Sequence, residues 1–553
     1  ATRIDRAGLI VKGRENLLVQ SNSFSTSPWA VSGTTLTGGQ TGYDGSNDAW
    51  LLTKTASAFL YLYQNISLSG VQSFSVYAKA GSLNIATLYI NATSNYYIKF
   101  SLVDGSVIEQ SNTGAIINTN AEDVGNGWYR LSATISDSIT RVRIYPDFTE
   151  TTAGNILIQD AQLEQGLAAS PYIESGATNG TAGVLENTPR LNYTTGVANP
   201  YLLLEPSRTN IVEESEYYNG VYWGLTNASV TNNATTSPEG LQNASKLIPA
   251  NGTGGNRSVS RNYASITGLH TFSVFAKAGE YGYISLRLRN SPSAFAMFDL
   301  TNGLVHAANT TQQMVSGSPK IEDYGNGWYR CSIVLDPSGS AAPGQLYPSY
   351  SAGITGDETN SFNGDGVSGI YIWGAQFEEG SYLTSYIPTY STSATRAVDS
   401  CSKSDASGDI NSTEGVLYAE VAALANGGVN RKISLNDGTA DNSVVMFYYS
   451  LSDYIFFQVY KAGTRILNLS VNNVDKSILH KIAFKYKNSD YSVWIDGVEL
   501  LTDSLADNIP ANTLNKLSFD GGVGAYPFNG KVNEVQVYKE ALTDAELITL
   551  TTI

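Results

Sequence analysis

The chain has 553 residues, 42% of them hydrophobic, with 35 Tyr and 52 Gly but only 3 His. This length predicts three or four domains at the usual size of about 100 to 200 residues each. The net charge of −16 argues against nucleic acid as a partner, because phosphate binding needs clustered Lys and Arg, and no apolar run approaches the roughly 20 residues of a membrane helix.

The chain contains an internal duplication. Asp123-Val-Gly-Asn-Gly-Trp-Tyr-Arg130 returns as Asp323-Tyr-Gly-Asn-Gly-Trp-Tyr-Arg330, an offset of 200 residues, and Trp29 aligns with Trp223 at an offset of 194. Such self-similarity indicates repeated structural modules. Residues that both copies share are expected to serve the fold, so Trp29 and Trp223 are predicted to be structural.

Both copies are predicted to be all-β. Phe74, Val76 and Ala78 alternate with polar or amphipathic residues at a period of two, which is typical of strands with one buried face. Many short strands joined by Gly and Asn turns indicate a two-sheet antiparallel sandwich, most plausibly a jelly roll. We place module 1 at residues 15–175 and module 2 at residues 208–389.

Connectors are predicted at residues 1–14, 176–207 and 390–412. The apolar run that begins at Tyr201 indicates a connector docked against a module and not a free linker. Ala394-Thr-Arg396 repeats the Ala1-Thr-Arg3 that opens the chain, so the chain begins inside a connector and we expect further sequence upstream. Cys331 and Cys401 lie in different segments and are predicted to be free thiols.

Residues 413–553 form a third predicted β-sandwich. Runs such as Gly415-Val-Leu-Tyr-Ala-Glu-Val421 have strand character. Asp496-Gly497 predicts a hairpin turn, and Trp494 just before it is expected in the core. Thr543-Asp-Ala-Glu546 has the spacing of a capping box, which predicts a short helix near the end of the chain.

Several motifs resemble known families. Leu203-Leu-Glu-Pro-Ser-Arg-Thr-Asn210, followed by Trp223, resembles modules of tailed-bacteriophage head-fibre and tail-fibre proteins, which are similar in turn to carbohydrate-binding jelly rolls. Trp494-Ile-Asp-Gly-Val498 and Phe528-Asn-Gly-Lys-Val532 look like a laminin G or concanavalin A-like lectin domain. The resemblance implies a virion-surface protein that contacts other virion proteins, and a homotrimer by analogy, although no heptad run is present.

Glycan binding requires exposed aromatic rings beside polar groups. Aromatic residues that only one copy carries are therefore candidates, together with tyrosines near predicted loops of the third module. The alternative for each is an ordinary strand residue of the fold. The carbohydrate-binding candidates are Trp50, Tyr96, Tyr97, Tyr281, Tyr283, Trp373, Tyr448, Tyr449, Tyr454 and Tyr526.

Two further sets are weaker. Alternation places Trp128 with Arg130, and Trp328 with Arg330, on the outward face of their strands. Each pair is either a platform for an acidic sugar or a scaffold pair covered by a loop, and its recurrence favours the scaffold. As candidate ligands of Ca2+ we name the loop carboxylates, although their spacing is not that of an EF-hand: Asp437, Asp441 and Asp520.

No catalytic motif stands out. His270, His306 and His480 have no metal-ligand spacing, and no nucleophile elbow or phosphate loop is present. The sequence therefore predicts a non-enzymatic protein that binds surface polysaccharide or the glycans of glycoproteins. Two alternatives stay open: a purely structural virion spacer, and a glycosidase or lyase whose paired carboxyls meet only in the fold.

Overall fold

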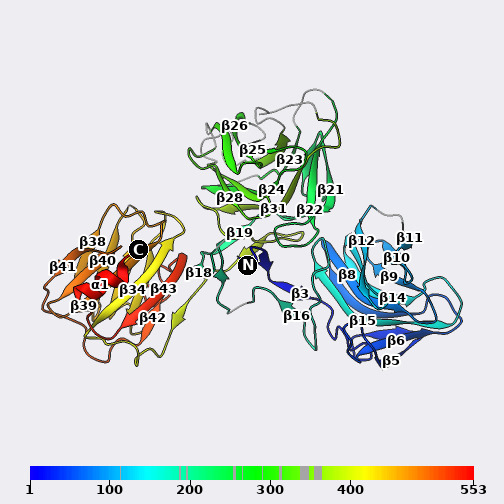
Figure 1. Cartoon of the computed structure of the whole chain (residues 1–553), viewed down its shortest axis with the longest axis horizontal. Helices are drawn as coiled ribbons and strands as arrows, with labels where there is room; N and C mark the ends of the chain where they lie inside the picture. The colour runs from blue at the N-terminus through cyan, green and yellow to red at the C-terminus, as the bar shows by residue number, and fades with distance from the viewer. Residues whose placement is uncertain are drawn as a thin grey trace. The chain divides into compact units, whose positions relative to one another are not determined.

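The computed structural model describes residues 1–111, 114–185, 188–194, 197–252, 257–263, 266–288, 291–309, 314–336, 348–353, 364–451 and 453–553. The fold is all-β, as predicted (Figure 1), and the chain divides into two compact units. Unit 1 comprises Ala1–Thr2, Leu9–Asn187 and Thr209–Ala394, and unit 2 comprises Arg3–Gly8, Thr188–Arg208 and Thr395–Ile553. Each unit is described by itself.

Module 1 is a sandwich of two six-stranded antiparallel sheets. Sheet A has the order β11 (Val107–Gln110), β10 (Asn95–Ser101), β9 (Ile85–Asn91), β14 (Ile139–Pro146), β7 (Tyr61–Leu68) and β4 (Ala30–Ser32). Sheet B has the order β12 (Ile116–Gly125), β13 (Trp128–Ser136), β8 (Val71–Ala80), β15 (Gly154–Gln165), β6 (Ala49–Lys54) and β5 (Thr34–Gln40). The inner faces of both sheets form one core, in which Leu88 and Ile144 of sheet A and Phe74 of sheet B are fully buried.

Module 2 repeats this topology strand for strand. Its first sheet has the order β20 (Gly224–Thr226), β23 (Ser258–Ser260), β30 (Pro348–Gly353), β25 (Tyr283–Leu288), β26 (Ser291–Asp299) and β27 (Leu304–Asn309). Its second has the order β21 (Ala228–Thr235), β22 (Ala244–Pro249), β31 (Ile370–Glu379), β24 (His270–Lys277), β29 (Trp328–Leu335) and β28 (Lys320–Asp323). Trp29 and Trp223 are both buried, which confirms their structural role.

Short strands accompany the connectors. In unit 1, β3 (Arg14–Asn16) pairs with β16 (Gly180–Ala182). Four more short strands are β1 (Thr2–Ile4), β2 (Ile10–Lys12), β19 (Arg208–Asn210) and β32 (Ala394–Arg396). Each of these six strands is three residues long, so its stability depends on packing against the larger sheets and not on its own ladder.

A buried charge cluster lies in unit 1. Lys12 Nζ is 2.8 Å from carboxylate oxygens of both Glu216 and Glu239, and Arg14 bridges Glu239 at 2.8 Å and Glu164 at 3.1 Å. Burial by itself would lower the pKa of Lys12, but the two carboxylates outweigh it and the pKa is raised. The ammonium group therefore stays charged inside the protein and offsets two buried acids.

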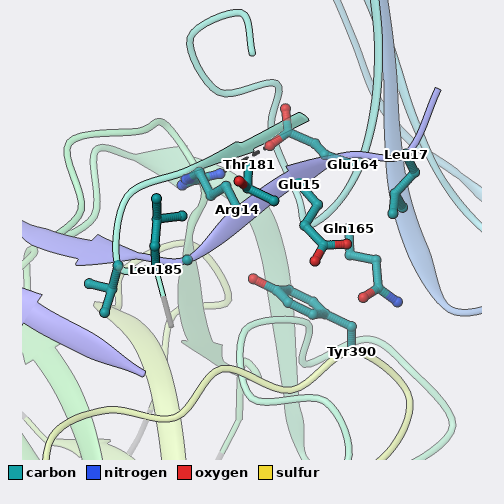
Figure 2. A pocket seen from close by; sticks show the side chains of 10 residues that line it. Arg14, Glu15, Leu17, Glu164, Gln165, Thr181, Leu185 and Tyr390 are labelled. Atoms are coloured by element: carbon teal, nitrogen blue, oxygen red, sulfur yellow. Dashed lines mark hydrogen bonds and ion pairs between the residues drawn. The ribbon is translucent and has the colours of Figure 1, made fainter. Parts of the chain in front are cut away.

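A hollow of about 690 Å³ opens beside this cluster (Figure 2). Arg14 and Glu15 of β3 line it, and Tyr390 faces them across it. The Tyr390 hydroxyl accepts a hydrogen bond of 3.1 Å from Lys12 Nζ. Because Arg14 is already paired with two acids, we assign no ligand to this hollow.

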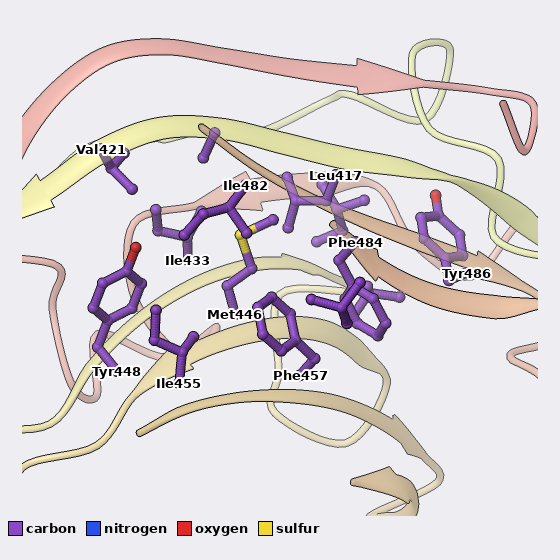
Figure 3. Packing of buried hydrophobic residues seen from close by; sticks show 14 of the residues in the cluster. Leu417, Val421, Ile433, Met446, Tyr448, Ile455, Phe457, Ile482, Phe484 and Tyr486 are labelled. Atoms are coloured by element: carbon purple, nitrogen blue, oxygen red, sulfur yellow. The ribbon is translucent and has the colours of Figure 1, made fainter. Parts of the chain in front are cut away.

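Unit 2 contains the third sandwich. One sheet has the order β17 (Leu191–Asn192), β18 (Tyr201–Leu204), β43 (Gly530–Tyr538), β34 (Glu414–Ala423), β39 (His480–Lys487), β40 (Tyr491–Ile495) and β41 (Val498–Asp503). The other has the order β33 (Ser402–Lys403), β42 (Lys516–Ser518), β35 (Arg431–Asn436), β36 (Ser443–Tyr448), β37 (Ile455–Lys461) and β38 (Thr464–Val471). Met446, Phe457, Ile482 and Phe484 pack between the sheets (Figure 3).

Local predictions for this module are confirmed. The helix α1 (Asp544–Thr551) begins at Thr543, which forms the predicted capping box with Glu546. Asp496 and Gly497 both have positive φ, as a tight turn between β40 and β41 requires, and Trp494 is buried.

The two cysteines of the chain, Cys331 and Cys401, are free thiols, as predicted. Within the described part of the chain, no helix is long and apolar enough to cross a membrane.

The segment 188–208 belongs to unit 2, although it lies in sequence between modules 1 and 2. Leu202 of β18 pairs with Val532 of β43, and Leu204 enters the core. Buried Glu205 forms ion pairs with Arg190 at 2.8 Å and with Arg396 at 2.9 Å. This segment thus contributes β17 and β18 to the C-terminal sheet. Hydrogen bonds, apolar packing and ion pairs hold it there.

Removing Lys12 should destabilise unit 1 strongly. In Lys12→Ala, Glu216 and Glu239 lose their shared counter-ion while they stay buried, and breaking a buried ion pair costs about 3 to 5 kcal/mol. We expect a loss of this size in the free energy of unfolding from urea titrations. Lys246→Ala is the matched control, because its partner Glu280 is half exposed, and it should cost under about 1 kcal/mol. Equal losses in the two variants would contradict the prediction.

Candidate functional site

The outward side of sheet A in module 1 is unusually aromatic. Leu62, Leu88 and Ile144 point into the core, so strand alternation sends their neighbours to the other side. We call this surface the tyrosine–arginine face, and its residues are Tyr61, Tyr63, Tyr89, Tyr97, Arg141, Arg143, Tyr145 and Phe148. All are partly exposed except Tyr145, which is buried beneath its neighbours.

Strand register brings these side chains into a row. Arg143 of β14 lies opposite Tyr63 of β7 on one side and Tyr89 of β9 on the other. Tyr89 in turn lies opposite Tyr97 of β10. Directly opposed residues have Cβ atoms about 4.5 to 5.5 Å apart, so four strands contribute to one continuous polar–aromatic row.

Ring contacts hold this row together. The Phe148 ring centroid is 5.2 Å from those of both Tyr89 and Tyr97, and 5.0 Å from that of Tyr145. The Arg143 guanidinium lies 4.4 Å from the ring centroid of Tyr61 and 5.1 Å from that of Tyr89. Such contacts fix the rings before any ligand arrives, which lowers the entropic cost of binding.

Hydrogen bonds set the polarity at the edge of the face. The Tyr97 hydroxyl donates to Glu109 Oε1 at 2.7 Å, and this bond raises the pKa of Tyr97. Glu109 also pairs with Lys99 at 2.8 Å. Deeper in the face, burial raises the pKa of Tyr145 to about 12, although Arg143 acts in the opposite direction. Tyr97 and Tyr145 are therefore neutral at physiological pH.

Module 2 lacks this surface. The same four-strand row reads Ser260, Ser349, Arg287 and Phe295. Only the last position is aromatic, and Arg287 is almost fully buried. Since the two modules share one topology, the aromatic character of module 1 is not a requirement of the fold.

A second aromatic surface lies on the sheet of unit 2 that contains β35, β36 and β37. We call it the C-terminal face, and its residues are Lys432, Phe447, Tyr449, Tyr454, Phe456, Tyr460 and Tyr526. Lys432, Phe447 and Phe456 are opposed across the three strands. Lys432 Nζ lies 5.0 Å from the ring centroid of Phe447 and 5.1 Å from that of Tyr526. Burial lowers the pKa of Lys432.

At the edge of this face, aromatic rings gather at the turn that joins β36 to β37. Tyr454 and Phe456 stack with ring centroids 6.0 Å apart, and Tyr449 meets Phe456 edge to face at 5.6 Å. Tyr454 is 36% exposed and Tyr526 is 48% exposed. Both rings are therefore partly exposed to solvent, as stacking on a sugar requires, and Tyr526 also contacts Lys432.

Four of the candidates from the sequence lie on these faces: Tyr97, Tyr449, Tyr454 and Tyr526. The sequence reasoning missed their neighbours, chiefly Tyr61, Tyr63, Tyr89, Tyr145 and Phe148 in module 1, and Phe447 and Phe456 in unit 2. Tyr61 and Tyr63 flank the apolar Leu62, and Ser258 and Ser260 occupy the equivalent places in module 2. The sequence therefore held a signal for this face, because module 1 has tyrosines at two positions where module 2 has serines.

Four other candidates are buried. Trp373 is fully buried beside Phe275 and Tyr386. Tyr448 points into the C-terminal core (Figure 3). Tyr96 and Tyr281 pack into the cores of modules 1 and 2. None of these rings presents a face to a ligand, because each is buried among the side chains of a core cluster.

Two candidates lie apart from both faces. Trp50 is half buried against the module 1 core, and its indole N–H donates to the Asn22 carbonyl at 2.8 Å. Tyr283 is partly exposed on module 2, where its ring meets that of His306 at 5.2 Å. Neither belongs to an aromatic cluster of the size seen in module 1 or unit 2.

The paired Trp and Arg of the repeated octapeptide are scaffold. Trp128 and Trp328 are buried, and Arg330 donates from Nη1 to the Thr384 carbonyl at 2.7 Å. Arg130 donates from Nη2 to Ser75 Oγ at 3.2 Å. Each arginine stacks over the aromatic ring on the neighbouring strand, Tyr77 or Phe275, and not over the tryptophan. The covering of Trp128 therefore leaves no sugar platform here.

Two of the three candidate calcium ligands accept hydrogen bonds within their own loops. Asp437 Oδ1 accepts from the backbone of Thr439 at 2.9 Å, and Asp520 Oδ1 accepts from Gly522 at 2.6 Å. Asp441 is exposed. Across the described ranges, no three His, Cys, Asp or Glu side chains are grouped so as to hold a metal ion.

Comparisons with known proteins concern mainly the C-terminal module. Residues 419–548 match the family model of the concanavalin A-like lectin/glucanases superfamily. No curated protein sequence matches the chain. This module is therefore similar to concanavalin A-like domains in sequence as well as in its two-sheet architecture.

Solved structures overlap the chain only loosely. A CBM40 of a Ruminococcus gnavus IT-sialidase, bound to alpha2,6 sialyllactose, is 17% identical with a TM-score of 0.24 and covers 28% of this chain and 94% of its own. A CBM22 tandem of Paenibacillus barcinonensis Xyn10C is 13% identical with a TM-score of 0.22, covering 67% and 99%. Mouse laminin alpha1 LG4-5 is 9% identical with a TM-score of 0.19, covering 59% and 91%. At these TM-scores the overlaps assign neither fold nor ligand.

Burial predicts that Trp373 is a poor choice for testing ligand binding. We expect Trp373→Ala to lower the free energy of unfolding by about 3 to 5 kcal/mol, the usual cost of truncating a buried Trp. Leu225→Ala in the same module is the control, because Leu225 is 38% exposed and should change stability by only about 0.5 kcal/mol. The measurement is thermal or urea unfolding followed by circular dichroism. If Trp373→Ala lowers the free energy of unfolding by less than about 1 kcal/mol, the result contradicts a fully buried position for Trp373.

Proposed function

We propose that this protein is a non-enzymatic adhesin that binds surface polysaccharide through the tyrosine–arginine face and the C-terminal face. The observation that carries the proposal is the set of partly exposed rings on the outer side of sheet A, which module 2 lacks on the same scaffold. Large aromatic side chains exposed in a cluster are uncommon on soluble proteins without a binding role.

The chemistry of the faces suits a sugar. One side of a pyranose ring presents C–H groups that stack on Tyr or Phe, while hydroxyl groups need hydrogen-bond partners. Each face combines stacked rings with Arg or Lys and with tyrosine hydroxyls. A shallow open face also suits a long polymer, which can extend beyond the protein at both ends.

Two weak sites on one chain favour avidity. Linking sites can raise apparent affinity by about 100-fold to 10,000-fold over either site alone. Each face therefore needs only modest affinity for one short stretch of glycan. Several copies on one particle would multiply the effect.

The resemblance of the Leu203–Asn210 and Trp223 motif to phage fibre modules supports a place for this adhesin on the virion surface of a tailed phage. There it would hold the glycans of a host cell or its surroundings and contact other virion proteins, with trimers as the assembly expected by analogy. A purely structural spacer is the second candidate, since fold alone does not determine function. The partly exposed rings on two faces favour the adhesin.

Truncating rings on each face should weaken polysaccharide binding. We expect Tyr97→Ala and Phe456→Ala each to raise the dissociation constant about tenfold, equivalent to about 1.4 kcal/mol, because each removes a stacking surface. The double variant should lose more than either single variant. Affinity electrophoresis in gels that contain bacterial capsular polysaccharides measures these changes.

Phe295→Ala is the matched control, because Phe295 occupies the register position of Tyr97 in module 2. It should leave migration unchanged. Circular dichroism checks that every variant is folded. If the wild-type chain binds none of the polysaccharides, or if all three variants behave alike, the spacer replaces the adhesin as the better account.

A further inference from the structure

We propose that the tyrosine–arginine face selects acidic glycans, with the sugar carboxylate bound by the guanidinium groups of Arg141 and Arg143. This inference rests on the proposed glycan binding and adds the substrate class and the two residues that determine it. It is carried by the contacts of these two arginines and by the charge balance of the chain around them.

Neither arginine has an acidic partner among the described residues. Arg141 donates from Nε to Asn65 Oδ1 at 2.6 Å and stacks over Tyr63 at 4.6 Å. Arg143 donates from Nη1 to the Tyr145 hydroxyl at 3.0 Å, and its Nε is buried without a hydrogen-bond partner. The groups around them are neutral amides and phenols.

This arrangement contrasts with that of other cations in the same unit, which pair with acids. Acidic residues outnumber basic ones, with 49 Asp and Glu against 33 Lys and Arg, so an arginine has many possible partners. Lys99, on the same face, pairs with Glu109 at 2.8 Å, and the buried Lys12 and Arg14 of unit 1 each contact two carboxylates. Two neighbouring cations without an anion therefore form a local positive site on a negatively charged protein.

The stacking geometry leaves the arginines able to bind an anion. A ring above or below a guanidinium contacts its flat side, whereas its N–H groups point outward in the plane. The Cζ atoms of the two arginines lie 4.4 to 5.1 Å from the ring centroids of Tyr61, Tyr63 and Tyr89, and among the described residues each arginine donates only one hydrogen bond, from Arg141 Nε and from Arg143 Nη1. A carboxylate can then accept two parallel N–H bonds, the pairing that arginine forms best.

The two arginines are also correctly placed for one ligand. They are two residues apart on β14, so both project from the same side of the strand. Arg143 occupies the centre of the row between Tyr63 and Tyr89, and Tyr97 ends that row. A sugar stacked on the tyrosines would bring a carboxylate on its ring within reach of the cations.

The test compares polymers that differ only in charge. Affinity electrophoresis of the wild-type chain uses polygalacturonate, its carboxyl-reduced neutral form and polysialic acid. We expect the carboxylated polymers to bind at least tenfold more tightly than the reduced one, with the preference weakening as NaCl is raised. Polygalacturonate and polysialic acid distinguish a uronate from a sialate as the preferred source of the carboxylate.

Variants locate the effect. Arg141→Gln, alone and combined with Arg143→Gln, should remove the preference for carboxylated polymers and leave the weaker binding of the neutral polymer unchanged. Arg143→Lys should keep part of the preference, because lysine keeps the positive charge. Arg465→Gln is the charge-matched control, because Arg465 is exposed on unit 2, and it should keep the full preference. Arg141→Gln alone suffices if the double variant fails to fold.

The outcomes separate the two proposals. Equal binding of charged and neutral polymers by the wild-type chain would overturn the acidic selectivity and leave glycan binding standing. A preference that survives Arg141→Gln and the double variant would overturn the assignment to these residues. Absence of binding to every polysaccharide tried, neutral or acidic, would overturn the proposed function together with this inference.

Discussion

Every sandwich in this chain depends on burying one side of each sheet against the other. The side chains of a strand alternate between two faces, so a slip of one residue would turn the whole apolar set towards solvent. Leu62, Leu88 and Ile144 are fully buried for this reason, and the register they fix decides where Tyr63, Tyr89 and Arg143 project. The functional surface is thus a consequence of the core, because the residues that fold the module also orient those that meet a ligand.

The duplicated modules show how this constraint leaves room for function. Modules 1 and 2 have identical strand orders, and their cores use equivalent inward positions such as Phe74 and Phe272. Their outer faces differ, because side chains on the outer side of a sheet lie outside the core between the two sheets and can change while that core is kept. Ser260 replaces Tyr63 in the central row of module 2, so one scaffold carries an aromatic surface and the other does not.

The sequence was informative about the fold and much less so about the sites. Period-two alternation, the repeated octapeptide and the capping box predict the sandwiches and α1, because each of these signals is local. Adjacent tyrosines are harder: Tyr96 and Tyr97, like Tyr448 and Tyr449, place one ring inside and one outside, and an aromatic residue suits either face. Trp373 was a misleading candidate for a different reason. Its counterpart Gln159 is also fully buried, so the difference between copies there reflects two ways of filling an interior.

The strand β18 has a consequence for how the chain is made. Its partner β43 lies near the C-terminal end, so Leu202 leaves the ribosome long before the strand beside which it finally lies. Closing so large a loop is slow relative to local pairing, and until then β18 (Tyr201–Leu204) can pair only with β17, so its other edge has no partner strand. Modules 1 and 2 can complete their own sheets earlier, during synthesis. Completion of the C-terminal sheet is therefore a late step, because it cannot occur before β43 has been translated.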